Sequence, residues 1–302
     1  MHECLIDSCG VTVVTAEVTR VEAEIEPPGP GSLHWRWAGE VRGYLLLVKA
    51  GLLQLMHPGL GAGVEQHSDF FTEPWERVLR SVPEIQGVTF DWPHGGRTAR
   101  KIRDFHTHIK GSYTGADGQG RRYHALDPEV YFWAHATIFD ALFQMIDLFD
   151  HPMSDAEKEQ LYAEGCAAYR AYGVSDRVVP PDWASFQAYF DRMCREELVI
   201  TPAARGLIEF AKEPPATFPL VPAPLYRLLR RPTAKPLWWL SVGTLPEPVR
   251  EQIGERWTVR DERRHQQFRR AVRTVWPLVP ARFRYTGRAR RGYARAGVGP
   301  LG

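Results

Sequence analysis

The sequence predicts an all-α fold: a single large helical domain over residues 31–280, with a peripheral N-terminal arm at 1–30 and a basic C-terminal tail at 281–302. Three observations lead to this prediction. Apolar residues recur at three- and four-residue spacing in several segments. Residues that can cap a helix precede several of these segments. Strong strand alternation is not evident outside the arm, and no internal repeat is present.

The composition is that of an ordinary globular protein, with 44% apolar residues, 25% charged residues and a formal net charge of +2. These values argue against a disordered chain and against a strongly basic nucleic-acid-binding protein. The four cysteines form no CxxC pair and have no zinc-finger spacing, so thiols in a reducing compartment are expected.

The N-terminal residues lack the basic and apolar regions of a signal peptide. The longest apolar run, residues 44–56, contains Lys49 and is shorter than the roughly 20 residues that a membrane-spanning helix needs. We therefore expect a cytoplasmic protein without a transmembrane segment.

The first half of the domain is expected to contain three helices. The prolines at positions 27, 28 and 30 end the arm because proline cannot continue a helix. A buried helix is predicted over residues 40–56, and it should end at His57 because the residue before a proline is displaced from the α region. Further helices are predicted over residues 74–82 and 98–110.

The second half carries clearer helix start signals. Asp127 can cap a helix that has Pro128 in its first turn and runs to about residue 149. Ser154 and Glu157 form a capping box for a helix that should end before Gly173, and another helix should follow Asp182. More helices are expected over residues 201–212, 225–230 and 261–276. The proline-rich stretch 214–248 is expected to be irregular with short helices.

Five of the eleven histidines lie within 42 residues: His94, His106, His108, His124 and His135. Clustered histidines suggest a metal site, but the spacing does not match HExxH. On a helix, His106 and His108 would point about 200° apart and could not share one ion. A compact zinc site is therefore not expected here.

His135 shares a predicted helix face with six apolar residues: Tyr131, Phe132, Ile138, Phe139, Leu142 and Ile146. This placement has two interpretations. A buried histidine on such a face is usually a hydrogen-bonded core residue. A neutral imidazole in an apolar environment is also what haem iron requires as its axial ligand.

The helix predicted over residues 98–110 places Arg103 on one face with His106 and Thr107. Arg100 adds positive charge nearby. Such side chains could bind the propionates of a haem or donate hydrogen bonds to bound oxygen. The alternative interpretation is a basic helix that faces solvent.

Several short motifs occur in order along the chain. They include residues 30–33, 52–58, 66–70 and 74–75, and the longer elements Arg103-Asp104-Phe105-His106-Thr107-His108-Ile109-Lys110-Gly111, Tyr123-His124-Ala125-Leu126-Asp127-Pro128 and Trp133-Ala134-His135-Ala136-Thr137. This series resembles the bacterial family related to the MpaB oxygenase and to the rubber oxygenases called latex-clearing proteins. The resemblance covers about residues 30–275.

The resemblance implies a helical fold that binds haem b through one histidine and cleaves isoprenoid double bonds with dioxygen. By motif, His135 corresponds to the proximal haem ligand, and Arg103 and Thr107 correspond to polar residues near the haem. His106 belongs to the same motif without an assigned role. The chain departs from its relatives because it lacks their export signal or membrane anchor. The acidic base of the rubber-cleaving branch has no clear match, and Glu84 and Asp91 are the nearest candidates.

The leading hypothesis is thus a haem b oxygenase with His135 on the iron and Arg103, His106 and Thr107 as candidate catalytic residues. Arg100 and Arg103 would bind the cofactor, and the partners would be dioxygen and a small apolar, isoprenoid-like substrate. A haem or apolar-ligand binding protein without turnover remains an alternative. A third hypothesis starts from the 13 arginines between positions 256 and 295, which could bind anionic lipids or nucleic acid, although the low net charge favours a solvated helix.

Overall fold

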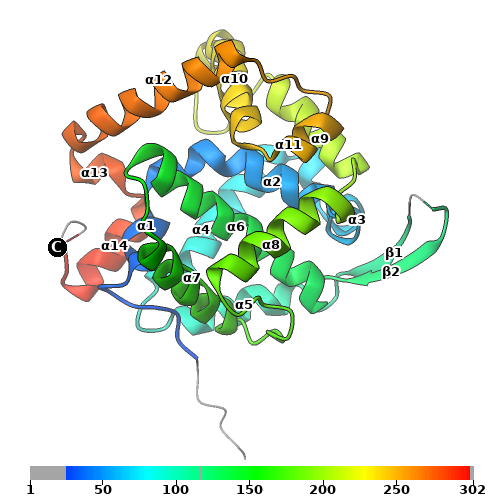
Figure 1. Cartoon of the computed structure of the whole chain (residues 1–302), viewed down its shortest axis with the longest axis horizontal. Helices are drawn as coiled ribbons and strands as arrows, with labels where there is room; N and C mark the ends of the chain where they lie inside the picture. The colour runs from blue at the N-terminus through cyan, green and yellow to red at the C-terminus, as the bar shows by residue number, and fades with distance from the viewer. Residues whose placement is uncertain (1–24, 116, 300–302) are drawn as a thin grey trace, which may run out of the picture.

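The computed structural model describes residues 25–115 and 117–299, and it confirms the all-α prediction. The protein is 69% helical, and its described part contains fourteen α-helices and one small two-stranded sheet (Figure 1). Most of the predicted arm, with Cys4 and Cys9, lies outside the described residues. Cys166 and Cys194 are buried free thiols.

The α-helices are α1 Leu33–Ala38, α2 Leu47–Met56, α3 Pro58–His67, α4 Pro74–Phe90, α5 Gly95–Phe105, α6 Pro128–Phe149, α7 Asp155–Arg170, α8 Trp183–Arg192, α9 Pro202–Lys212, α10 Ala223–Thr244, α11 Glu247–Gln252, α12 Val259–Val275, α13 Ala281–Arg284 and α14 Gly287–Ala296. Short 3-10 turns are η1 Val41–Leu46, η2 Asp69–Phe71 and η4 Trp276–Leu278, and η3 Met193–Glu197 is a π turn. The strands are β1 Lys110–Thr114 and β2 Gly120–His124.

Helix α6 runs through the middle of the molecule (Figure 1), and α2, α7 and α12 pack against it. Aromatic rings of α8 also contact Phe132 and Trp133 of α6. Its apolar side chains fill the main core. Trp133 is fully buried, and its indole Nε1 donates a hydrogen bond to the Leu53 carbonyl of α2 at 2.9 Å. Burial of the large Trp133 side chain, whose one polar atom is hydrogen-bonded, stabilises the packing of α2 against α6.

The predicted helix starts are confirmed where a local cap specifies them. The Asp127 side chain accepts a hydrogen bond from the Glu129 backbone N–H at the start of α6. Ser154 and Glu157 form the capping box of α7. Gly173 follows α7 with a φ of 69°, a left-handed conformation that a side chain would disfavour.

The helix predicted over residues 40–56 ends at Met56 as expected, although its first turn is the 3-10 segment η1. His57 then caps a new helix, because its ring nitrogen accepts a hydrogen bond from the Leu60 N–H at 3.3 Å. Among the described helices none is by itself long and apolar enough to cross a membrane, although residues 41–56 and 58–67, which meet at 99°, pass the length and composition criteria together.

The prediction of one helix over residues 98–110 was wrong at its C-terminal end. Helix α5 ends at Phe105, and after a turn the chain forms the β1–β2 hairpin, which projects from the helical body (Figure 1). The hairpin depends on tertiary contacts with α3. The Tyr123 hydroxyl donates to Gln66 Oε1 at 2.8 Å, and the Gln66 side chain donates to the Ser112 carbonyl at 2.9 Å. A short, polar sequence of this kind carries little periodicity of its own.

The prediction that residues 214–248 are irregular was also wrong, because α10 continues through Pro232 and Pro236 for 22 residues. A proline inside a helix removes one backbone hydrogen bond. Here the end of the helix buries Trp238 and Leu240. Burial against the core therefore outweighs the local preference.

The C-terminal segment after residue 280 packs on α1 and α4 (Figure 1). Tyr285 and Tyr293 are buried with Trp35 and Phe90 in a second, smaller core. The guanidinium of Arg288 donates hydrogen bonds to both oxygens of Asp91, at the end of α4. At least part of the basic charge in this segment therefore balances an acidic residue of the domain.

Candidate functional site

The candidate site is built around His135 on α6, whose side chain is partly buried. Its Nδ1 lies 3.0 Å from the carbonyl oxygen of Tyr131, one helical turn earlier. The aromatic rings of Tyr172, just after α7, and Tyr169, in its last turn, lie edge-on to the imidazole with ring centroids 4.6 and 5.0 Å away. The ring of Tyr131 lies 5.1 Å from the imidazole between centroids, so three tyrosine rings pack against His135.

The imidazole of His135 is held neutral. Burial lowers its pKa to about 4, despite the hydrogen bond to the Tyr131 carbonyl, which acts in the opposite direction. A neutral ring that donates from Nδ1 carries its free electron pair on Nε2. Within the described residues Nε2 has no hydrogen-bond partner. An oriented Nδ1–H with an available Nε2 is the arrangement found in histidines that ligate metals.

The Tyr131 hydroxyl is buried and has no hydrogen-bond partner among the described residues. The ring lies between two histidines, 5.9 Å from His106 and 5.1 Å from His135 between centroids. Burial, with Tyr172 and Tyr169 nearby, raises its pKa well above 10, so the hydroxyl stays protonated. It can therefore donate a hydrogen bond, but the described part of the protein supplies no acceptor.

Arg103 and His106 reach this site from the end of α5. One guanidinium nitrogen of Arg103, Nη1, lies 3.3 Å from the Tyr172 carbonyl, while its Nε lies 2.9 Å from Asp104. The Nδ1 of His106 lies 2.7 Å from the Ile102 carbonyl, and burial lowers the pKa of this histidine. Three predicted residues thus meet around the tyrosines. They meet because the C-terminal end of α5 contacts Tyr131 of α6 and Tyr172 after α7. The single helix face predicted for 103, 106 and 107 does not exist beyond residue 105.

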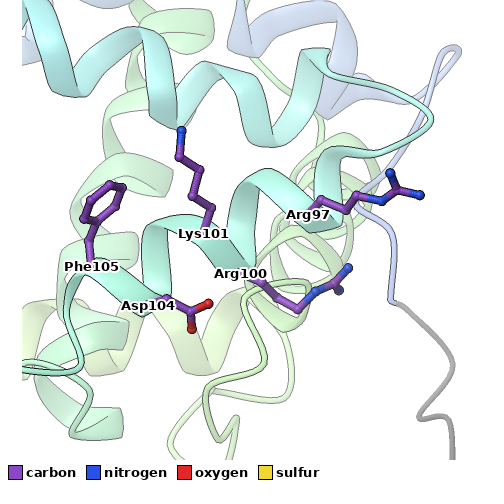
Figure 2. Close-up of a pocket in the computed structure, with 5 residues that line it drawn as sticks. All are labelled: Arg97, Arg100, Lys101, Asp104 and Phe105. Atoms are coloured by element: carbon purple, nitrogen blue, oxygen red, sulfur yellow. The ribbon is translucent and has the colours of Figure 1, made fainter.

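Thr107 and Arg100 are placed elsewhere. Thr107 is exposed in the turn after α5, where its carbonyl pairs with the His124 ring at 3.1 Å. Arg100 lines a surface hollow of about 510 Å³ together with Arg97, Lys101, Asp104 and Phe105 of α5 (Figure 2). Figure 2 shows Arg97 and Arg100 pointing to the same side of α5 and Lys101 pointing toward the neighbouring helix.

Neither acidic candidate lies next to His135 in the described contacts. Asp91 accepts hydrogen bonds from Arg288 and from Thr98, at the opposite end of α5 from Arg103. Burial alone would raise the pKa of Asp91, but these hydrogen bonds keep it below its usual value. Glu84 pairs with Lys101 at 3.5 Å and Arg288 at 3.7 Å. Both carboxylates are bound in structural ion pairs.

The sequence alone did not indicate that Tyr131, Tyr169 and Tyr172 surround His135. The sequence identified Tyr131 only as an apolar residue one turn before His135. Tyr169 lies in the last turn of α7, and Tyr172 lies just after that helix. In the part of the chain that the structure describes, no group of three or more His, Cys, Asp or Glu side chains could hold a metal ion. A metal at this site would therefore rely on His135 and on a cofactor for its other ligands.

Comparison with known proteins supplies the family. Residues 35–275 match the family model described as the ER-bound oxygenase mpaB/B'/Rubber oxygenase, catalytic domain. No curated protein and no solved structure matches the chain. The matched region runs from α1 to α12 and includes every residue of the candidate site. Since it covers well over half of the sequence, the chain belongs to the family of MpaB and rubber oxygenase catalytic domains, a family of oxygenases.

Proposed function

We propose that this protein is a haem-dependent oxygenase that acts on a small apolar substrate, with His135 as the proximal haem ligand. Membership of the oxygenase family supports the reaction class. The observation that carries the haem assignment is the state of His135. Its ring is neutral, its Nδ1 is bonded to a backbone carbonyl, and its Nε2 has no partner within the described residues.

The residues around His135 fit a haem in their chemistry. His135 would ligate the iron through Nε2, and the guanidinium of Arg103 would pair with a propionate or a polar oxygen. The orphaned Tyr131 hydroxyl offers one further donor inside the site. The haem, when bound, supplies iron that activates dioxygen. The aromatic rings of Tyr169 and Tyr172 would exclude water, and an isoprenoid is the first substrate class to test.

The haem assignment is tested by spectroscopy. The protein is purified, haemin is added, and the Soret band is recorded for the wild type, for His135→Ala and for the control His108→Ala. His108 is exposed in the turn after α5 and belongs to the same histidine-rich stretch. We expect a Soret band in the wild type and the control, and its loss or displacement in His135→Ala. A wild-type protein that takes up no haemin would refute the assignment.

Oxygen consumption separates an oxygenase from a haem protein without turnover. The haem-loaded protein is placed in an oxygen electrode with an isoprenoid alcohol as substrate and, separately, with a phenol. Steady consumption that His135→Ala abolishes is the expected result. Haem uptake without consumption would instead favour the ligand-binding alternative, in which the same residues bind the haem without turnover.

The proposal includes a cytoplasmic location and no nucleic-acid partner, as the sequence predicts. Arg288 and Arg295 of the basic tail are already engaged, the first with Asp91 and the second with the Phe90 carbonyl at 2.7 Å. The exposed arginines that remain could still contact anionic lipid at the membrane surface. Sedimentation with anionic vesicles at low salt tests this contact, and no co-sedimentation would reject it.

A further inference from the structure

A second hollow lies on the other side of α6. A hollow of about 400 Å³ opens between α6, α10 and α12, and Gln144, His265 and Arg269 are among the residues that line it (Figure 1 shows the three helices). Gln144 follows His135 by nine residues, which on an α-helix is half a turn around the axis and about 13 Å along it. The hollow is therefore separate from the candidate haem site, and ligand binding in it is independent of the proposed function.

Among the described residues, three polar groups in this hollow lack partners. His265 is only 2% exposed, and its Nε2 is buried without a hydrogen bond. The Gln144 Oε1 is likewise buried without a donor. Arg269 is half-buried, and within the described part of the chain its guanidinium makes no hydrogen bond or ion pair. Buried polar groups are almost always satisfied in folded proteins, so the two buried atoms of His265 and Gln144 beside an unpaired guanidinium require an explanation.

Neighbouring acidic residues do not satisfy Arg269. Glu262 accepts hydrogen bonds from the Trp257 indole at 3.0 Å and from Gln266 at 2.9 Å. Asp147 accepts from the Met153 N–H at 2.7 Å. Both carboxylates line the hollow but stand beyond ion-pair distance of Arg269. Burial and the nearby Arg269 lower the pKa of His265, so the imidazole is neutral and adds no charge.

We infer that the hollow binds a zwitterionic α-amino acid with an aliphatic side chain. Its carboxylate would pair with the planar guanidinium of Arg269, which suits bidentate recognition. Its ammonium would donate to the Gln144 Oε1. A lone carboxylate would be repelled by Asp147 and Glu262, and a lone ammonium would leave the Arg269 guanidinium unpaired, so a ligand that carries both charges is expected. The apolar part of the wall comes from Leu148, Leu245 and Pro246.

The test uses isothermal titration calorimetry of the full chain with three probes. L-leucine carries both charges, 4-methylpentanoate carries only the carboxylate, and 3-methylbutylamine carries only the ammonium. The variants are Arg269→Met, which keeps the apolar stem, and Gln144→Leu. The control is Arg270→Met, because Arg270 is the next residue on α12 and its side chain is exposed.

We expect L-leucine to bind more tightly than either single-charge probe. Arg269→Met should weaken L-leucine binding by about tenfold to a hundredfold, the range of a lost charge-assisted contact, while Arg270→Met changes nothing. Gln144→Leu should abolish the preference for L-leucine over 4-methylpentanoate, a change in selectivity that poor folding would not produce. Absence of L-leucine binding up to about 10 mM, or equal binding by wild type and Arg269→Met, would overturn the inference.

Discussion

Replacement of His34 by glutamine should reduce the acid sensitivity of this protein. His34 lies in α1, is 8% exposed, and has its Nε2 3.1 Å from the Thr89 hydroxyl, while its Nδ1 is buried without a partner among the described residues. Burial lowers its pKa to about 4 from 6.5. Above pH 6.5 both the folded and the unfolded chain carry the neutral ring, so the free energy of unfolding is independent of this group.

As the pH falls below 6.5, the unfolded chain binds a proton at this histidine and the folded protein does not. The free energy of unfolding therefore decreases until the folded ring also binds the proton, near pH 4. With these two pKa values, His34 lowers the free energy of unfolding by about 2 kcal/mol between pH 7 and pH 5. Burial also lowers the pKa values of His57 and His135 to about 4, so these two histidines still contribute to the pH dependence of unfolding in the variant.

The assay is urea unfolding of the wild type and His34→Gln at pH 7 and pH 5. Any loss of packing in the variant is present at both pH values, so it cancels in the double difference. We expect the variant to lose about 2 kcal/mol less than the wild type on acidification. The exposed His108→Gln variant controls for removal of an imidazole. Identical pH dependence in wild type and His34→Gln would show that the buried ring is not the source of the effect.

Three further predictions concern packing, the buried ion pair and the candidate site. Gly39→Ala should destabilise the fold by about 1–3 kcal/mol in urea unfolding, because the new Cβ would lie 2.7 Å from the Phe90 ring. In the control Gly43→Ala the new Cβ would meet no atom within 4 Å, so its effect on stability should be nearly neutral. Lys49→Met should lower the free energy of unfolding by about 3–5 kcal/mol, because it leaves the partly buried carboxylate of Asp140 unpaired. The double variant with Asp140→Leu should regain most of this stability, and no recovery would contradict the explanation. Arg103→Lys should leave the melting temperature nearly unchanged but lower the amount of haem retained per chain, because an ammonium cannot reproduce the planar contact beside Tyr172. Equal Soret absorbance in both proteins would place Arg103 outside the haem site.

Local chemistry in the sequence determined where most helices begin. Asp127 with Pro128, the Ser154–Glu157 capping box and Asp182 each start a helix at the predicted position. A cap acts through hydrogen bonds to backbone N–H groups two or three residues away, so the sequence alone contains the whole interaction. The apolar periodicity around His135 likewise predicted α6 and the residues that share its apolar face.

Only the tertiary structure decided the hairpin, the long α10 and the composition of the site. The β1–β2 hairpin is held by Gln66 of α3, far away in sequence, and α10 passes through two prolines because its second half is buried. The tyrosines around His135 come together because α7 packs beside α6, while Thr107 turns away once α5 stops at Phe105. These features depend on contacts between distant segments, whose free energy exceeds the weak local preferences that a sequence pattern records.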